Sequence, residues 1–301
     1  MRHGHFIALR LALHYLFFPN FVPLMKGMGL KMDNRPIGVF DSGLGGLSCV
    51  KEIMKVLPNE SIVYFGDTSR VPYGNRSKEI IIKYTYQDIK FLLSKNIKAI
   101  VVACGTISSV AINEAKKSSA VPLIGVLESA VNSAVKVTKN NNIGVLGTIA
   151  TINSMAYEKA LLNINNSLKI TNKACPLFVP LVENGYFNED NQISYLVAQQ
   201  YLEPLIKAKV DTIILGCTHY PLLKKIISKI MGSSVTLIDA GKQTALTLSK
   251  MLAQQDMCCQ ASKANYSYFV SDGVESFTKN AIIFLENDLI GKVEKIDIEL
   301  C

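Results

Sequence analysis

Two cysteines stand where an apolar run of residues gives way to polar ones. Cys104 follows the run "KAIVVA" and precedes Gly105 and Thr106, and Cys217 stands in the similar stretch "TIILGCTH". A single free cysteine is most often a buried core residue. The repeated context indicates two reactive thiols instead, because a helix that begins just after the sulfur favours the thiolate.

A histidine and an acid are further candidates for proton transfer. His219 comes two residues after Cys217 and is the only histidine beyond residue 14. Its side chain titrates near neutral pH, so we expect it to accept a proton. A Cys-x-His pair also suits a metal, but no fourth ligand accompanies it, so we predict no metal site. Glu183 comes just past another predicted strand, where the sequence does not distinguish it from a surface acid.

Two polar loops offer groups that could hold a small charged ligand. The loop "DSGLGGLS" (41–48) contains Asp41 and Ser42, and it lacks the glycine that a dinucleotide fingerprint needs at its sixth position. Asp41 would repel a phosphate and fits an ammonium group better. The loop "GDTSRVPYGNRS" (66–77) turns at Pro72 and Gly74, and could present Tyr73 and backbone amides to a carboxylate.

The elements that must position these residues alternate along the chain. Apolar runs predict strands at 36–40, 61–65, 98–103, 122–126, 142–146, 176–180, 211–215 and 235–238. Helical periods lie at 46–57, 77–95, 107–117, 151–163, 191–208 and 220–230. Strands that are apolar on both faces and alternate with helices indicate an α/β fold with mainly parallel sheets. Ligands of such folds bind past the carboxyl ends of the strands, which is where Thr148 also lies.

Composition excludes several classes of protein. The chain of 301 residues is 49% hydrophobic and carries a net charge of +8, but no Lys/Arg-rich run with interleaved aromatic residues is present, so we expect no nucleic-acid partner. Residues 5–25 are apolar but interrupted by Arg10, His14, Pro19 and Pro23, so we expect neither a membrane span nor a cleaved signal. We predict that 1–32 is a leader outside the fold. The seven cysteines form no C-x-x-C pair and predict a reduced, cytoplasmic protein.

Taken together, the motifs resemble those of the cofactor-independent glutamate racemases. The matching stretches are "IGVFDSGLGGLS", "GDTSRVPYG", "VVACGT", "VPLVENG", "LGCTHYPLL" and "LIDAG", in the order and spacing of that family, over about residues 35–290. The resemblance implies two similar α/β domains, 33–130 together with 240–301 and 131–239, with the active site in the cleft between them. It also implies an isomerase that needs no cofactor, supplies D-glutamate for peptidoglycan and cell-wall synthesis, and forms a homodimer.

The resemblance also assigns roles to residues. Inversion of an α-carbon needs a base on one face and an acid on the other. By analogy Cys104 takes the proton from D-glutamate and Cys217 takes it from L-glutamate. Asp41 would support Cys104, His219 would support Cys217, and Glu183 would lie near the second pair. The substrate would be held by Asp41, Ser42, Tyr73, Gly74, Gly105, Thr106, Thr148, Thr218 and His219.

One position departs from the family and leaves alternatives open. The family usually has asparagine where this chain has Gly105. A water or Ser108 could replace the lost amide contact, in which case Gly105→Asn would lower the Michaelis constant or leave it unchanged. The alternatives are a racemase of aspartate or a related acid, a thiol-redox protein that uses Cys104, and a non-catalytic amino-acid-binding relative.

Overall fold

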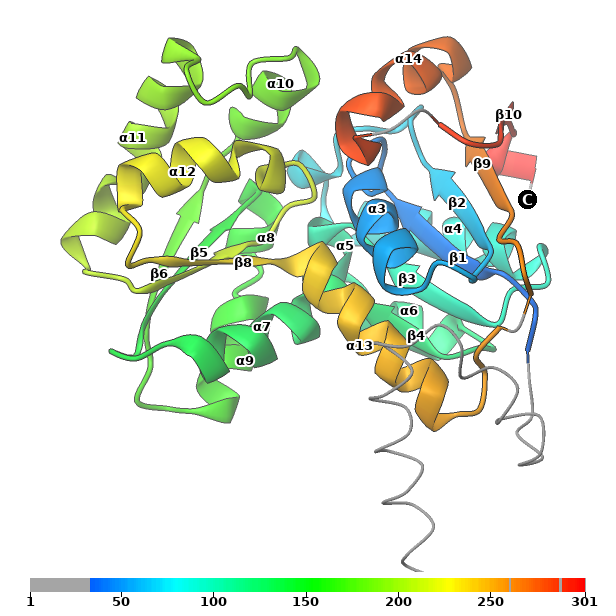
Figure 1. The fold of residues 1–301 in the computed structure, drawn as a ribbon, viewed down its shortest axis with the longest axis horizontal. Coiled ribbons are helices and arrows are strands. Elements are labelled where there is room, and N and C mark those ends of the chain that lie inside the picture. Colours follow the sequence, from blue (N-terminus) through cyan, green and yellow to red (C-terminus); the bar gives the residue numbers. More distant parts are fainter. Residues whose placement is uncertain (1–32, 260, 287–288, 301) are drawn as a thin grey trace, which may run out of the picture.

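The strands form two separate sheets, both entirely parallel. The computed structural model describes residues 33–259, 261–286 and 289–300, and the predicted leader, 1–32, lies outside this part of the chain. Figure 1 shows one sheet in each half of the molecule, with β8 leading from the left half into α13. The predicted α/β class with parallel sheets flanked by helices is confirmed.

The first sheet holds the first four strands and the last two of the described chain. Its six strands run in the order β10 (Lys292–Lys295), β9 (Tyr266–Val270), β2 (Ile62–Gly66), β1 (Ile37–Asp41), β3 (Ala99–Val102) and β4 (Leu123–Gly125). The second sheet holds four, in the order β6 (Lys169–Ala174), β5 (Asn142–Gly147), β7 (Thr212–Leu215) and β8 (Thr236–Asp239). The central strands are buried on both faces, as parallel sheets covered by helices require.

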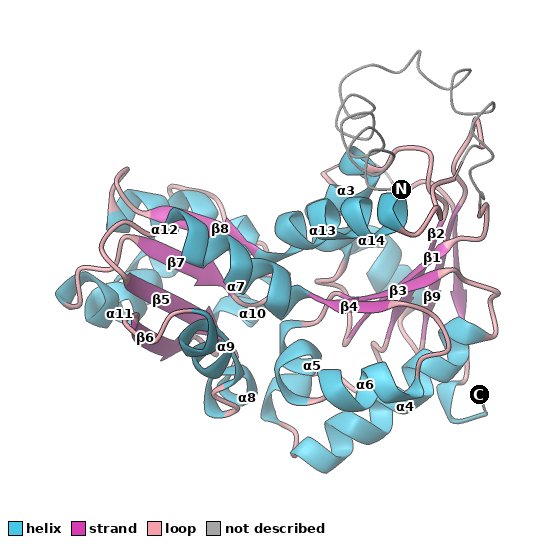
Figure 2. Cartoon of the chain, turned by 90° about the horizontal axis from the view of Figure 1, so that it is seen from below, coloured by secondary structure: helices cyan, strands magenta, loops and turns pink. Residues whose placement is uncertain are grey.

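Helices cover both faces of each sheet (Figure 2). Around the first sheet these are α3 (Leu47–Val56), α13 (Ala240–Gln254) and α14 (Val274–Leu285) on one face, and α4 (Lys78–Leu93), α5 (Gly105–Val110) and α6 (Ile112–Ser118) on the other. The second sheet is flanked by α7 (Val126–Val137), α8 (Ile149–Asn153), α9 (Ala156–Ile164), α10 (Phe178–Glu183), α11 (Gln192–Lys207) and α12 (Lys224–Met231). Three short 3-10 helices complete the fold, namely η3 (Tyr73–Asn75), η4 (Tyr220–Leu223) and η5 (Ile298–Leu300).

One apolar core runs through both halves of the molecule. It joins Val39 and Val101 of the first sheet to Ile213 and Leu215 of the second. The helix α13 follows β8 directly and packs on both α3 and α7, so it ties the two sheets together. Among the described residues, no helix is long and apolar enough to cross a membrane.

The structure corrects several predicted elements. The segment predicted as a strand at 176–180 is a turn followed by the first residues of the helix α10, and the strand is β6, which ends at Ala174. The sequence of β6, "KITNKA", hides it because this edge strand is half exposed and has no apolar run. The predicted helix 107–117 is two helices that meet at Ala111, and 151–163 is broken at Met155, whose φ is 55°. The segment 220–230 begins as the 3-10 turn η4.

Candidate active site

Four parallel strands bring the predicted chemical groups to one region between the sheets. Asp41 ends β1, Cys104 follows the neighbouring β3, Thr148 follows β5, and Cys217 follows the neighbouring β7. The carboxyl ends of parallel strands lie at one edge of a sheet, which is where ligands of α/β folds bind. Each sheet therefore contributes one of the two cysteines.

The first cysteine lies in a buried acidic setting. The Cys104 thiol donates to the hydroxyl of Ser42 over 3.6 Å, and its residue is 4% exposed. Burial, and then the negative charge of Asp41, raise the pKa of Cys104 to about 12. The start of α5 does favour the thiolate, since the backbone amide of Ile107 lowers the pKa, but burial and Asp41 outweigh it. In the free protein Cys104 is a thiol, ready to donate a proton.

Asp41 is held by the glycine loop that follows it. Its Oδ2 accepts from the backbone amides of Gly46 at 3.0 Å and Gly43 at 3.2 Å. Burial raises the pKa of Asp41, although the charge of His219 and the hydrogen bonds of the loop oppose the rise. Its other oxygen, Oδ1, is buried and has no hydrogen-bond partner among the described residues.

The second cysteine is part of a chain of three groups. The Cys217 Sγ lies 3.9 Å from Nδ1 of His219, whose Nε2 lies 2.9 Å from Oε1 of Glu183. Burial alone would lower the pKa of His219, but the hydrogen bonds and negative charges of Cys217 and Glu183 outweigh it and raise the pKa to about 10. At neutral pH the ring is therefore an imidazolium, which stabilises negative charge on the nearby sulfur. Glu183 ends the helix α10 rather than following a strand, and its side chain is 45% exposed.

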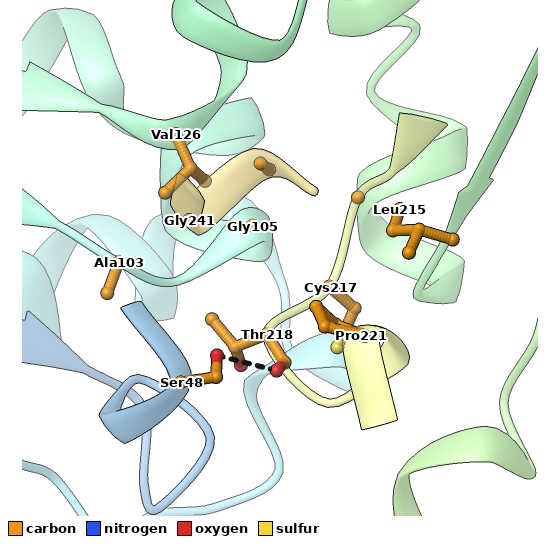
Figure 3. A pocket seen from close by; sticks show the side chains of 11 residues that line it. Ser48, Ala103, Gly105, Val126, Leu215, Cys217, Thr218, Pro221 and Gly241 are labelled. Atoms are coloured by element: carbon orange, nitrogen blue, oxygen red, sulfur yellow. Dashed lines mark hydrogen bonds between the residues drawn. The ribbon is translucent and has the colours of Figure 1, made fainter. Parts of the chain in front are cut away.

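Close contacts join the two walls of the site. The hydroxyls of Thr106 and Thr148 lie 3.0 Å apart. A Cβ added to Gly74 would lie 3.0 Å from Cβ of Thr148. On the other side, Ser48 donates to the carbonyl of Thr218 over 2.8 Å, and Figure 3 shows this bond beside Cys217.

The backbones also approach one another where glycines allow it. A Cβ on Gly105 would lie only 2.0 Å from the carbonyl oxygen of Gly216, and a Cβ on Gly45 would lie 2.3 Å from Oγ1 of Thr218. A narrow pocket remains here, lined by Ser48, Gly105, Gly216, Cys217, Thr218 and Pro221 among others (Figure 3). Glycine at 105 thus permits a closer fit between the walls than any other residue would.

Tyr73 and Ser108 do not fit their predicted roles. The Tyr73 hydroxyl donates to Asp67 and lies 3.5 Å from Asp88, in a buried cluster with Arg70. It is therefore not free to bind a carboxylate. The Ser108 hydroxyl donates to the carbonyl of Val102 and accepts from the amide of Val126, so it cannot replace an asparagine amide at 105. Ser48, which no sequence pattern singled out, does reach the second wall through the carbonyl of Thr218.

Metal-ligand geometry is a separate question. Among the described residues, no group of three or more His, Cys, Asp or Glu side chains lies close enough to hold a metal ion.

Comparisons with known proteins agree with this arrangement. The family model "Asp/Glu/Hydantoin racemase" matches residues 42–247. A glutamate racemase of Geobacter metallireducens is 42% identical over 266 residues, which are 88% of this chain and 97% of that protein. One from Chlorobaculum tepidum is 43% identical over 256 residues, 84% of this chain and 93% of that protein.

Solved structures give the same result. The crystal structure of a glutamate racemase from Bacillus anthracis has a TM-score of 0.84 at 38% identity and covers 88% of this chain and 99% of its own. A glutamate racemase of Francisella tularensis, solved in complex with D-glutamate, has a TM-score of 0.83 at 37% identity and covers 89% of this chain and 100% of its own. Similarity of this extent, together with two cysteines on facing strand ends, shows that the chain belongs to the glutamate racemases of the Asp/Glu/Hydantoin racemase family.

Proposed function

We propose that this protein interconverts L- and D-glutamate by proton transfer through Cys104 and Cys217. The observation that carries the proposal is the placement of one thiol on each wall of a narrow site. Each thiol has its own ionisable neighbour, Asp41 for the first and the His219–Glu183 pair for the second. The glutamate racemases that match nearly the whole described chain support glutamate as the substrate.

The two thiols begin the reaction in different states. Cys104 keeps its proton because burial and Asp41 raise its pKa, whereas the imidazolium of His219 lies beside the Cys217 sulfur. The Cys217 thiolate removes the α-proton of L-glutamate, and the electron pair of the broken C–H bond is delocalised into the α-carboxylate. The S–H of Cys104 then gives its proton to the opposite face and produces D-glutamate. The sulfurs have exchanged protonation states, so the reverse path starts from a Cys104 thiolate.

Substrate binding calls for groups of opposite polarity. The free oxygen of Asp41 suits the ammonium group. We assign the carboxylates to the hydroxyls and backbone amides around Ser42, Gly74, Thr106, Thr148 and Thr218, which the cross-wall contacts bring together, with Gly105 and His219 beside them. Tyr73 would contribute through its backbone only. These uncharged donors bind carboxylates without adding a group that titrates near neutral pH.

Several finer predictions remain part of the proposal. We propose that the domains divide near residues 130 and 239, in line with the membership of the two sheets. We also propose that the protein is a cytoplasmic homodimer that supplies D-glutamate for peptidoglycan. Sedimentation equilibrium tests the dimer, and complementation of a D-glutamate auxotroph tests the role in the cell.

The decisive experiment is hydrogen exchange at the α-carbon. Purified protein in deuterium oxide, without added cofactor and after dialysis against a chelator, should convert each glutamate enantiomer to the other with deuterium at the α-position. The control is Cys259→Ala, because Cys259 is also a buried thiol but donates to the side chain of Asn34, just before the start of β1 and so at the opposite end of the first sheet. It should exchange at the wild-type rate. Activity that is lost with the chelator and returns with zinc would overturn the mechanism.

Aspartate is the second candidate substrate, since the chemistry at the α-carbon is the same. The family model that matches residues 42–247 is named for aspartate as well as glutamate racemases. Faster exchange of aspartate than of glutamate would establish it.

A further inference from the structure

Tyr157 carries a buried hydroxyl that the fold leaves without a partner. It lies in the first turn of α9, and the residue is only 2% exposed. No described residue makes a hydrogen bond with this hydroxyl. Buried polar groups in native proteins nearly always have a partner, so an exception calls for a ligand or a functional role.

The hydroxyl end of the ring lies beside the catalytic backbone. Its Cε2 and Cζ atoms lie 3.3 and 3.5 Å from the place that a Cβ on Gly216 would occupy. Gly216 precedes Cys217, and its carbonyl faces Gly105, which follows Cys104. Tyr157 therefore lies where the two walls meet.

Both thiols act on this hydroxyl electrostatically. Burial, then the charges of Cys217 and Cys104, raise the pKa of Tyr157 above its usual range. The phenol therefore stays protonated and remains a hydrogen-bond donor throughout the working pH range. Neither sulfur, however, is its hydrogen-bond partner. A ligand that binds between the two sulfurs can supply an acceptor for it.

The site contains a second unpartnered atom of opposite character. Oδ1 of Asp41 is also buried and unpaired among the described residues, and an ionised carboxylate can only accept. The α-carbon that must lie between the sulfurs carries one donor group, the ammonium, and one acceptor group, the carboxylate. The two orphaned atoms match these two groups, with Asp41 facing the ammonium.

We propose that the hydroxyl of Tyr157 donates a hydrogen bond to the α-carboxylate of the bound amino acid. This inference rests on the proposed function, since it assumes that the α-carbon lies between the two sulfurs. When the α-proton leaves, its electron pair moves into the carboxylate, so the oxygen at Tyr157 becomes more negative. A donor aimed there binds the transition state more tightly than the ground state, and so contributes to the rate rather than to binding alone.

The test compares two single-atom deletions. Tyr157→Phe removes only the hydroxyl. The matched control is Tyr268→Phe, because the Tyr268 hydroxyl is likewise buried and unpaired, but it lies on β9 and the charge that acts on it is that of Tyr266. We expect Tyr157→Phe to lower kcat about 10- to 100-fold with a smaller change in KM. Tyr268→Phe should keep wild-type kinetics, and neither variant should melt below the wild type, since each loses an unsatisfied group.

The outcomes separate this inference from the proposed function. If kcat of Tyr157→Phe stays within about twofold of the wild type, the inference is overturned. The proposed function would still hold if the wild-type protein exchanges the α-proton of glutamate. A fall in the melting temperature of Tyr157→Phe, absent in Tyr268→Phe, would show a structural role and also overturn it. Failure of the wild type to exchange the α-proton of glutamate would instead refute the proposed function itself.

Discussion

A side chain at position 105 should force the two walls of the active site apart. A Cβ there would lie 2.0 Å from the carbonyl oxygen of Gly216 and 3.0 Å from its carbon. Carbon and oxygen normally approach no closer than about 3.3 Å. One wall must therefore move by about 1.3 Å. Neither atom can rotate away, because the Cβ is attached directly to the main chain and the oxygen belongs to it. Misplacement of reacting groups by about 1 Å can cost a factor of about 100 in rate.

Two variants separate the Cβ from the amide that the family usually carries. Gly105→Ala and Gly105→Asn share the Cβ, so we expect both to lower kcat/KM by about 100-fold, measured by circular dichroism with either enantiomer. Their melting temperatures should fall together, because the apolar core shared by the two halves is strained equally when the same Cβ separates the walls. The sequence alone suggested the opposite, namely that asparagine would restore a substrate contact.

The result that would refute this reasoning is a gain of function. If Gly105→Asn matched or exceeded the wild type while Gly105→Ala did not, the amide would be making its contact in a cleft that opens freely. Wild-type rates in both variants would show that the close approach at Gly216 is not part of the working geometry.

Three further variants test the other groups. Cys104→Ser should racemise neither enantiomer but should still eliminate hydrogen halide from a β-halogenated glutamate whose α-proton faces Cys217; loss of this half-reaction would argue against separate faces. Glu183→Gln should move the alkaline limb of the kcat/KM profile to lower pH. The His219 imidazolium loses its proton as pH rises through about 10, and the variant lowers this pKa by removing the negative charge of Glu183. An unchanged alkaline limb would contradict this. Tyr73→Phe should lower the free energy of unfolding by about 1.5–3 kcal/mol in urea titrations with little change in KM, because the lost hydroxyl contacts the buried acids Asp67 and Asp88. A large rise in KM at unchanged stability would show instead that this hydroxyl binds the substrate.

The sequence was a good guide to elements with a repeating apolar pattern. Buried strands such as β1 and β7 were predicted to within one residue, because their residues are all buried and mostly apolar. The half-exposed β6 was missed because its sequence, "KITNKA", contains no apolar run. The last strands, β9 and β10, belong to the first sheet, and β9 pairs with β2, which lies more than 200 residues earlier in the chain. No local sequence pattern reveals such a pairing.

The candidate site shows the same division. Cysteines at strand ends are visible in a sequence, and so is a histidine two residues later. The electrostatic environment of a residue is not visible in a sequence. Cys104 precedes a helix, yet burial and Asp41 determine its ionisation. Nor does a sequence show which hydroxyls are already paired. Tyr73 was predicted to face a ligand, yet its hydroxyl is engaged; the hydroxyl of Tyr157, which no sequence pattern singled out, has no partner among the described residues.

The unequal settings of the two thiols affect kcat and KM of the two enantiomers differently, although the reaction itself is symmetric. The enantiomers of glutamate have equal free energies in solution, so kcat/KM must be the same in both directions whatever the enzyme does. Under the proposed two-thiol mechanism, burial beside Asp41 keeps Cys104 protonated, so the free enzyme holds the acid that the path from L-glutamate requires. D-glutamate must bind the rarer form of the enzyme, in which the protons are exchanged, and this raises the KM for D-glutamate. Because kcat/KM is equal for the two enantiomers, kcat for D-glutamate is higher by the same factor. The asymmetry therefore governs which enantiomer saturates the enzyme first, not the direction of net turnover.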